Sequence, residues 1–374
     1  MRSTTDVGRL AAGAFLLFAG ACSDGEEKAS GSGGAPCVLD AGPDADPCDG
    51  DGDGHRAAAC GGDDCDDANK DVHPGAIDVC DGDDNDCDGA ADQDDACDCA
   101  EPPPKPGLPF TDRVCLKGGW FWMGMGLTDP HAHEYAYVAS PIHQVFVSPI
   151  HMDRYEVTNR RYIACLDAGI CTLQNLAGTS KTWDRAEHET PEQLDRPFLG
   201  GSAKNGGEYC KWAGGRLPTE AEWERAAAGL GDKPRPYPSG MTLPTCAEEV
   251  LFACGVPSPG GEFRLADRVG TKKSNPDGLF DLGGNASEWV ADLWFDDAYS
   301  ACVAPCKNPC VGCSTGKNMW DDDGHGSRGL DAGSSSAKEV FYRAQFRDRV
   351  SQDHASHDIF NQGFRCAYPV ASKR

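Results

Sequence analysis

Residues 214–229, GGRLPTEAEWERAAAG, constrain the fold more than any other part of this 374-residue chain. Thr219 stands three residues before Glu222, which is the spacing of a capping box, where each side chain bonds the backbone N–H of the other residue. Alanines fill the body of the segment, and Gly229 is the residue type at which many helices end. The motif therefore predicts a helix that begins after Thr219 and ends at Gly229.

A second pattern is the stretch 143–158, HQVFVSPIHMDRYEVT, in which apolar and polar residues alternate. This alternation predicts a strand. Trp223, Trp289 and Trp294 are expected in the core or along a groove, because large rings bury well. A buried or half-buried polar network that holds loops together is expected of three charged residues: Arg216, Glu220 and Glu222.

Five segments follow one another in an informative order. They are GGWFWMG at 118–124, DRYEVTNRRY at 153–162, YCKWAGGRLPTEAEWE at 209–224, NPDGLFDLGGNASEWVADLW at 275–294 and NQGFRCAYP at 361–369. Together they resemble the formylglycine-generating enzyme family, the sulfatase-modifying-factor domain, over roughly residues 110–370. The resemblance implies an α+β fold related to C-type lectins, with little regular secondary structure. It also implies copper and oxygen chemistry that converts a substrate cysteine into formylglycine.

The copper ligands of that family are two cysteines five positions apart, shortly before a terminal GFRC. GFRC is present here at 363–366, but the alignment puts Ala337 and Tyr342 where the two thiolates belong, with Ser334 as a groove candidate. Copper(I) in such a site is held by soft sulfur, which a methyl group and a phenol cannot replace. We therefore expect no catalytic residue of the family type, and a domain that keeps the fold and the groove without the oxidase.

The resemblance also implies a disulfide. In the family, the GFRC cysteine pairs with the cysteine before WAG, and these are Cys366 and Cys210 here. The two ends of a second family bridge fall at Ala227 and Arg347, so that both are lost together. This paired loss supports the alignment.

A calcium site is implied at the turn before SEW. The family binds calcium there through positions that are Asp281, Gly284, Ala286 and Glu288 in this chain. Two side-chain oxygens and backbone carbonyls suit a hard cation. Calcium is therefore an expected cofactor, whereas copper is not.

The charge of the chain is concentrated near its N-terminus. Residues 22–100 hold 24 Asp and Glu against three Lys and Arg, so this part carries −21 of the total formal charge of −26. Such a surface repels nucleic acid and anionic lipid and attracts cations. The composition excludes a nucleic-acid partner.

Residues 84–95, DNDCDGAADQDD, fit the calcium-loop pattern. Asp84, Asp86 and Asp88 take positions 1, 3 and 5, Gly89 gives the turn at position 6, and Asp95 stands at position 12. The wider pattern resembles a metal-binding motif common in exported bacterial proteins and, more loosely, thrombospondin type 3 repeats. Calcium, a softer metal such as copper, and a solvated acidic stalk without metal remain as alternatives.

An earlier half-loop has the same start. Asp49, Asp51, Asp53 and Gly54 repeat positions 1, 3, 5 and 6, but Cys60 stands at position 12. This loop therefore needs a ligand from elsewhere, and the candidates are Asp63, Asp64, Asp66 and Asp67. The module is too small to build a core, and interleaved cysteines are expected to cross-link it: Cys48, Cys60, Cys65, Cys80 and Cys87.

The N-terminus reads as a bacterial lipoprotein signal. Arg2 and Arg9 are followed by an apolar run and by AGAC, which ends at the expected lipidation site Cys22. A cleaved secretory signal is the alternative. Ser23 favours the outer membrane, and the twenty cysteines fit an oxidising compartment. We expect an outer-membrane lipoprotein that faces the periplasm or the cell surface and touches the membrane through its lipid alone.

These observations give the expected organisation of the chain. It is a lipoprotein signal peptide at 1–21, a flexible tether at 22–47, a calcium-binding-type Asp/Cys module at 48–100, a proline-rich linker at 101–109 and the sulfatase-modifying-factor-like domain at 110–371. The fold class is α+β with a disulfide-rich acidic N-terminal module.

Three functions stay open from the sequence. The leading one is a non-oxidase that binds a peptide, a glycan or an envelope protein, or that assembles an envelope complex. The second is a formylglycine-generating oxidase with relocated ligands from an insertion that either binds metal or forms two disulfides: Cys302, Cys306, Cys310 and Cys313. The third is a calcium- or copper-binding surface protein that acts through the acidic module.

Overall fold

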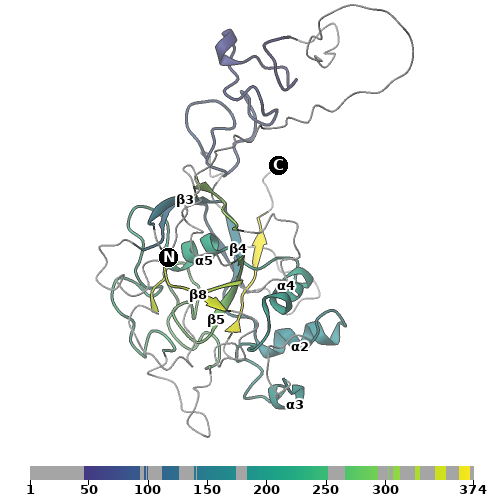
Figure 1. Ribbon diagram of the computed structural model, residues 1–374, viewed down its shortest axis with the longest axis vertical. Helices are drawn as coiled ribbons and strands as arrows, with labels where there is room; N and C mark the ends of the chain where they lie inside the picture. Colours follow the sequence, from purple (N-terminus) through teal and green to yellow (C-terminus); the bar gives the residue numbers. More distant parts are fainter. Residues whose placement is uncertain are drawn as a thin grey trace, which may run out of the picture. The chain divides into compact units, whose positions relative to one another are not determined.

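The helix predicted from the capping box is present as α5, Glu220–Ala228 (Figure 1). The Thr219 hydroxyl accepts from the Glu222 amide at 3.2 Å, and the Glu222 carboxylate accepts from the Thr219 amide at 2.8 Å. The helix ends at Gly229, whose φ of 86° is unfavourable for other residues. Every residue of α5 is buried, so this helix belongs to the interior of the domain.

The computed structural model describes residues 46–92, 97, 99, 112–125, 139, 141–173, 183–251, 266–293, 302, 306–311, 325–328, 342–350 and 362–370. All of them lie in one compact unit, 46–374, and the other unit is 1–45. Several predicted features fall outside the described residues: the segments 1–45 and 101–109, and Cys22, Asp95, Trp294, Cys313, Ser334 and Ala337. Within the described part, no helix combines the length and the hydrophobicity needed to cross a bilayer.

Short strands form small sheets in the described part of the chain. One antiparallel sheet has the order β1 (Arg113–Leu116), β4 (Ile150–Asp153), β10 (Ala367–Pro369). A second has the order β2 (Gly119–Met123), β3 (His143–Val147), β6 (Cys306–Lys307). A third has the order β8 (Arg347–Val350), β7 (His325–Arg328), β5 (Ser287–Leu293), β9 (Gln362–Gly363). The helix α5 contacts β2, β3, β5 and β7.

The remaining helices are equally short. They are the 3-10 turn η1 (Ala58–Cys60) and the helices α2 (Asn159–Asp167), α3 (Arg185–His188) and α4 (Ala203–Trp212). Little of the described chain is therefore regular secondary structure, as expected from the resemblance.

The stretch 143–158 is not the single strand that its alternation predicts. It breaks at Ser148 and Pro149 into β3 and β4, which belong to different sheets. Proline has no N–H for a strand ladder, and the Ser148 amide donates to the side chain of Asn308 at 2.8 Å. The break lets one segment bring two sheets together.

Aromatic rings fill the core between α2, α4 and β5. Tyr162 stacks on Phe198 at a centroid distance of 3.6 Å, and Phe364 packs against both edge-on. Trp223 and Trp289 are buried as predicted, and the Trp289 ring donates to the Gly201 carbonyl at 2.7 Å.

Disulfides hold the chain together where regular structure is sparse. All sixteen cysteines of the described residues are disulfide-bonded. Fourteen of them form seven pairs between described residues: Cys48–Cys60, Cys65–Cys87, Cys80–Cys97, Cys99–Cys115, Cys165–Cys171, Cys210–Cys366 and Cys302–Cys306. The other two, Cys246 and Cys310, are also in disulfides. The Cys210–Cys366 pair is the one that the resemblance implied, and it joins α4 to the segment between β9 and β10.

Candidate functional site

Tyr342, one of the two positions predicted from the sequence to align with the copper ligands of the family, is a buried side chain in a well-fixed segment. It is 6% exposed. The following residues anchor it, since the Ala344 amide donates to the Pro236 carbonyl at 3.0 Å and the Gln345 side chain donates to the Arg235 carbonyl at 3.0 Å. A phenol at this position offers no soft sulfur for copper(I).

The cysteine insertion does not offer a replacement thiolate pair among its described members. Cys302 is bonded to Cys306, and Cys310 is also in a disulfide. The donor atoms of His143, Cys302 and Cys306 lie within 4.8 Å of one another. Sulfur that is already bonded to sulfur does not act as a thiolate ligand, so the disulfide alternative for the insertion is the one that the structure forms here.

Two residues of the predicted calcium turn differ in how their carboxylates are used. Asp281, with a φ of 63°, accepts from the Gly270 amide through one oxygen at 2.7 Å, while its Oδ1 is buried without a partner. Glu288, on β5, is fully engaged. It accepts from the Arg365 guanidinium at 2.6 Å and 2.8 Å and from the Trp223 ring at 2.8 Å. Glu288 is therefore an ion-pair partner here, and calcium at this turn remains a prediction.

Glu156 and Glu249 complete this acidic cluster, and the sequence did not single them out. Glu156 accepts from the Asn285 side chain at 2.7 Å and from the Ala286 amide at 3.0 Å. Glu249 is 2% exposed and has a buried oxygen without a partner. A Cβ atom on Gly284 would lie 2.3 Å from the Val250 carbonyl oxygen, which is too close. Only glycine therefore lets the turn pack this closely against the 249–250 backbone.

The cluster holds more carboxyl groups than cationic groups. Burial raises the pKa of Glu249 to about 8, and the charge of Asp281 adds to the shift. Burial likewise raises the pKa of Asp281 to about 6 and that of Glu156 well above its ordinary value. Arg365 is the cation that these groups share. A hard cation would balance the excess charge, and unpartnered carboxylate oxygens are the donors that calcium prefers.

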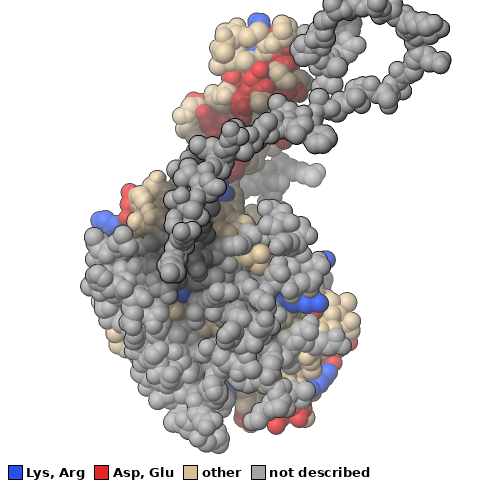
Figure 2. Space-filling view, viewed as in Figure 1, with Lys and Arg blue, Asp and Glu red and all other residues tan. Residues whose placement is uncertain are grey.

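The acidic module presents its carboxylates on the surface of 46–92 (Figure 2). In the loop predicted to hold calcium, the Gly89 amide donates to Asp84 at 2.8 Å, the Asp88 amide to Asp86 at 3.3 Å and the Ala90 amide to Asp88 at 3.0 Å. One carboxylate oxygen of each of the three aspartates lies within 4.8 Å of the others. The backbone thus turns three acids toward one point.

The earlier half-loop repeats this hydrogen-bond pattern position by position. The Gly54 amide donates to Asp49 at 3.1 Å, the Asp53 amide to Asp51 at 3.2 Å and the His55 amide to Asp53 at 2.7 Å. Their carboxylate oxygens also gather within 4.8 Å. The predicted equivalence of the two loops therefore extends to their backbone geometry.

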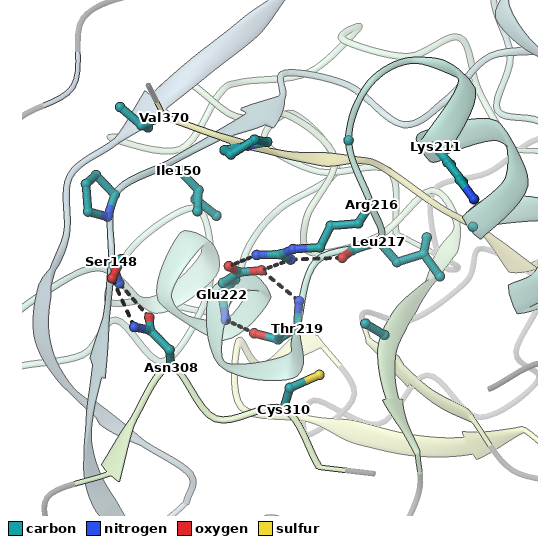
Figure 3. A pocket seen from close by; sticks show the side chains of 15 residues that line it. Ser148, Ile150, Lys211, Arg216, Leu217, Thr219, Glu222, Asn308, Cys310 and Val370 are labelled. Carbon is teal, nitrogen blue, oxygen red and sulfur yellow. Dashed lines mark hydrogen bonds and ion pairs between the residues drawn. The ribbon is translucent and has the colours of Figure 1, made fainter. Parts of the chain in front are cut away.

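A cleft of about 660 Å³ lies between the end of α4, the start of α5 and the C-terminal strand β10 (Figure 3). Arg216 and Glu222 form an ion pair within it at 2.6 Å, and Lys211 contributes a second cation to its lining. Glu220 does not join this pair. It bonds Arg347, a lost disulfide position, at 2.8 Å to 2.9 Å, so the predicted network is two separate ion pairs.

Comparison with known proteins gives the family. A model described as the sulfatase-modifying factor enzyme 1-like domain matches residues 99–370, which is most of the chain. The chain belongs to this family. A second model, described as "Putative metal-binding motif", matches residues 64–93, so metal binding is expected of the acidic module on independent grounds.

Relatives within the family are of several kinds. The chain is 29% identical over 310 residues to the formylglycine-generating enzyme of Streptomyces coelicolor, which covers 68% of this chain and 88% of that one. It is 30% identical over 217 residues to the inactive C-alpha-formylglycine-generating enzyme 2 of Mus musculus, covering 48% of this chain and 68% of the relative. It is 29% identical over 206 residues to the serine/threonine-protein kinase pkn1 of Chlamydia caviae. This match covers 52% of this chain but only 30% of the length of the relative.

The fold of the family is also found among solved structures. PvdO from Pseudomonas aeruginosa aligns with a TM-score of 0.51 and 24% identity over 68% of this chain and 93% of that one. At this level of identity the similarity concerns the fold alone. The predicted fold class and the family resemblance are confirmed.

Proposed function

We propose that this chain is a non-oxidase member of the sulfatase-modifying-factor family that binds a peptide, a glycan or a protein partner at the cell envelope. The observation that carries the proposal is the buried phenol of Tyr342 at a copper-ligand position. The disulfide bonding of all sixteen described cysteines supports it. Among the relatives, one carries a name that states inactivity, so lost activity has a counterpart within the family.

The binding role rests on what the domain retains. The cleft beside β10 has about 660 Å³ of space, which is within the range of small-molecule and side-chain binding sites. Arg216 is half-exposed while its partner Glu222 is buried, so the pair presents a fixed cation to the cleft. A partner with an acidic or hydrogen-bond-accepting group fits this lining.

Export and lipid anchoring belong to the same proposal. Disulfides persist in oxidising compartments and are rare in the cytosol, and this chain has at least seven between described residues. With lipid on Cys22, the protein would be tethered to the outer membrane. Cell fractionation with detection of the protein by mass spectrometry tests this. The unmodified protein should be found in the membrane fraction, and replacement of Cys22 by Ala should release it into the soluble fraction.

The loss of the oxidase is tested directly. Purified oxidised chain is incubated with copper(I), oxygen and a peptide that contains Cys-x-Pro-x-Arg, and aldehyde is measured by mass spectrometry. We expect no product, because no described thiolate is available to the metal. A control variant that restores both sulfurs, Ala337→Cys with Tyr342→Cys, should gain tight copper(I) binding. Aldehyde formed by the unmodified chain would refute the proposal, and loss of that aldehyde in Cys302→Ser would point to relocated ligands.

A second candidate function is calcium binding by the acidic module. It is favoured by the 84–89 loop, where amides turn Asp84, Asp86 and Asp88 toward one point. Oxygen donors at alternate positions before a glycine turn suit calcium better than copper. Calorimetric titration of the full chain with calcium should give heat that Asp86→Asn reduces. No heat with either chain would leave the acidic stalk as the explanation.

A further inference from the structure

The Cys302–Cys306 disulfide closes the shortest loop among the seven bridges between described residues. Its cysteines are four positions apart, whereas those of the next shortest bridge, Cys165–Cys171, are six apart. In the chain-entropy model, a disulfide restricts the unfolded chain less as its loop becomes shorter. Stabilisation of the fold is therefore a weak reason for this bridge.

The two cysteines of this bridge differ in their access to solvent. Cys302 is half-buried, whereas Cys306 is 6% exposed and lies in β6, where it stands opposite Val145 of β3. In thiol–disulfide exchange, a thiolate attacks one sulfur and the other sulfur leaves as a thiolate. Cys302 is thus placed to be attacked, and Cys306 is placed to leave.

His143 brings an imidazole to the bridge. One of its ring nitrogens lies within 4.8 Å of both sulfur atoms. Its Nδ1 donates to the Pro141 carbonyl at 2.9 Å, so that Nε2 is the basic nitrogen of the neutral ring. Burial lowers the pKa of His143, and the charge of Arg347 adds to the shift. The ring is therefore neutral at pH 7 and can accept a proton from an incoming thiol.

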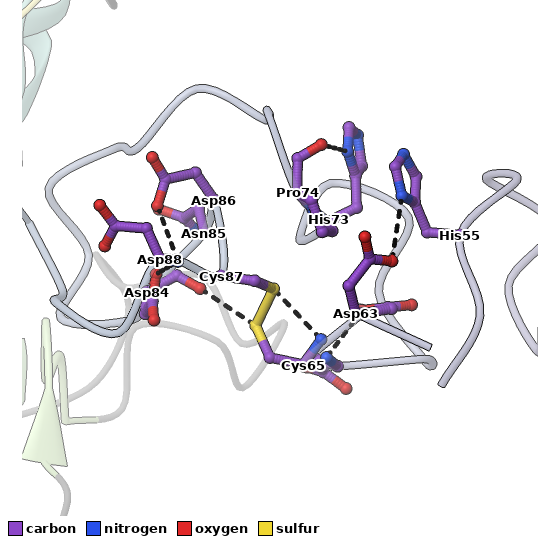
Figure 4. Close-up of a disulfide and its surroundings, with 12 residues drawn as sticks. His55, Asp63, Cys65, His73, Pro74, Asp84, Asn85, Asp86, Cys87 and Asp88 are labelled. Carbon is purple, nitrogen blue, oxygen red and sulfur yellow. Dashed lines mark hydrogen bonds and ion pairs between the residues drawn. A yellow bond between two sulfur atoms is a disulfide. The ribbon is translucent and has the colours of Figure 1, made fainter. Parts of the chain in front are cut away.

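The Cys65–Cys87 disulfide lies in the opposite electrostatic environment (Figure 4). Cys87 stands between Asp86 and Asp88, and the Cys65 sulfur contacts the Asp84 carbonyl at 3.5 Å. Neighbouring carboxylates disfavour a thiolate, whereas a neighbouring histidine favours one. Because Cys65 is exposed, this bridge has the better access and the poorer chemistry of the two.

We propose that Cys302–Cys306 is a redox-active disulfide that oxidises the paired thiols of a second polypeptide, with His143 as the base. The bridge has the features that such exchange requires, namely a half-buried sulfur to attack, a buried leaving sulfur and an adjacent imidazole. This activity goes beyond the binding role proposed above, and it requires neither copper nor oxygen.

The exchange balances in two steps. The first substrate thiol gives its proton to His143, and the resulting thiolate attacks the Cys302 sulfur. The bond between Cys302 and Cys306 breaks, and Cys306 leaves as a thiolate that takes the proton from the imidazolium. The second substrate thiol then attacks the mixed disulfide and passes its proton to the departing Cys302 sulfur. Two electrons and two protons have moved from the substrate to the cysteine pair, and a disulfide oxidant such as oxidised glutathione restores the bridge.

The rates of two bridges in the unmodified chain test the proposal. Full oxidised chain is incubated without oxygen with reduced glutathione and a copper chelator, samples are alkylated, and mass spectrometry measures the reduction of each bridge. We expect Cys302–Cys306 to be reduced at least about tenfold faster than Cys65–Cys87. Equal rates, or faster reduction of Cys65–Cys87, would overturn the proposal. This comparison needs no variant, so a variant that fails to fold leaves it intact.

The role of the imidazole is tested in the same assay. His143→Asn removes the base, and we expect it to slow the reduction of Cys302–Cys306 by about tenfold without changing the rate at Cys65–Cys87. The matched control is His188→Asn, at a histidine whose ring also bonds a backbone carbonyl, and both rates should stay unchanged there. An unchanged rate at Cys302–Cys306 in His143→Asn would refute the activation by this residue.

The activity itself is measured with a synthetic peptide that contains two cysteines. The oxidised chain should convert one equivalent of this peptide to its disulfide, and the double variant Cys302→Ser with Cys306→Ser should not. With oxidised glutathione, Cys306→Ser should retain a mixed disulfide on Cys302, whereas Cys302→Ser should capture little glutathione. No peptide oxidation by the unmodified chain would overturn the activity, and preferential capture by Cys306 would overturn the order of attack.

Discussion

Glu288 and Arg365 form a fully buried ion pair, 2.6 Å between Oε1 and Nη2, with exposed fractions of 1% and 0% for the two side chains. One residue lies in the SEW segment and the other in GFRC, so two signature segments of the family are tied to each other inside the core. Arg365 also donates to the Phe280 carbonyl at 2.9 Å. The pair thus holds the predicted calcium turn against the C-terminal segment.

Replacement of Arg365 by Met should destabilise the protein strongly. Glu288 would be left as an uncompensated buried charge beside Asp281 and Glu156, and breaking such a pair costs about 3–5 kcal/mol. Urea unfolding measures the loss. Arg185→Met, which removes an exposed ion pair with Asp167, is the control and should leave the midpoint almost unchanged; equal effects of the two variants would contradict a special role for Arg365.

Stability without calcium should fall as the pH rises from 5 to 8. The folded-state pKa values of Glu249 and Asp281 are raised to about 8 and about 6, so the folded chain holds protons that the unfolded chain has released, and stability present at low pH is lost through this window. Each group contributes a slope of at most about 1.4 kcal/mol per pH unit. Melting temperatures measured in a chelator at several pH values between 5 and 8 test this expected decrease in stability.

Two changes should flatten this pH dependence. Glu249→Gln removes a carboxyl whose pKa is raised to about 8, and added calcium favours the charged forms and so raises the melting temperature most at pH 8. A stability that rises with pH in the chelator, or calcium that acts equally at pH 5 and pH 8, would count against the cluster as a cation site.

The Cys210–Cys366 disulfide should stabilise the chain more than Cys165–Cys171 does. The two bridges span 156 and 6 residues, and in the chain-entropy model they contribute about 5 and about 2 kcal/mol. Both lie in the same buried cluster, so the double alanine variants differ mainly in loop length. If the two variants had the same unfolding midpoint, this result would argue against the entropic account.

The capping box of α5 should contribute about 1 kcal/mol through the Thr219 side chain. Thr219→Ala removes the acceptor for the Glu222 amide, whereas Thr219→Ser keeps it. Denaturant unfolding should therefore separate the two variants. Similar losses in both would show that the methyl group of Thr219, and not its hydroxyl, supplies the stability.

Local features of this fold could be predicted from residue patterns, whereas a long-range one such as the Cys210–Cys366 disulfide could be expected only from the family resemblance. The helix after Thr219 depends on residues within one turn of each other, and it was predicted with its cap and its end. The break at Pro149 was missed because the alternation on its two sides continues, although the ladder hydrogen bonds do not. A proline inside an alternating run was the signal that could have found it.

The candidate sites divide in the same way. The predicted loss of copper ligands rests on two aligned positions, whereas Glu156 and Glu249 join the cluster only because distant segments fold against the 281–286 turn. The sequence offered four aspartates as a further ligand for the earlier half-loop. In the structure, Asp64 alone of the four is buried, and its backbone forms a bridge with Ala57.

The bond between Cys65 and Cys87 has a consequence for the timing of maturation. Without this bond, the two acidic loops are connected only through the chain between the two cysteines, which are 22 positions apart. Oxidation ties the segment that follows Asp64 to the middle of the 84–89 loop, where Cys87 stands. If the 84–89 loop binds calcium as proposed, its affinity should therefore depend on whether this pair of sulfurs has met an oxidant.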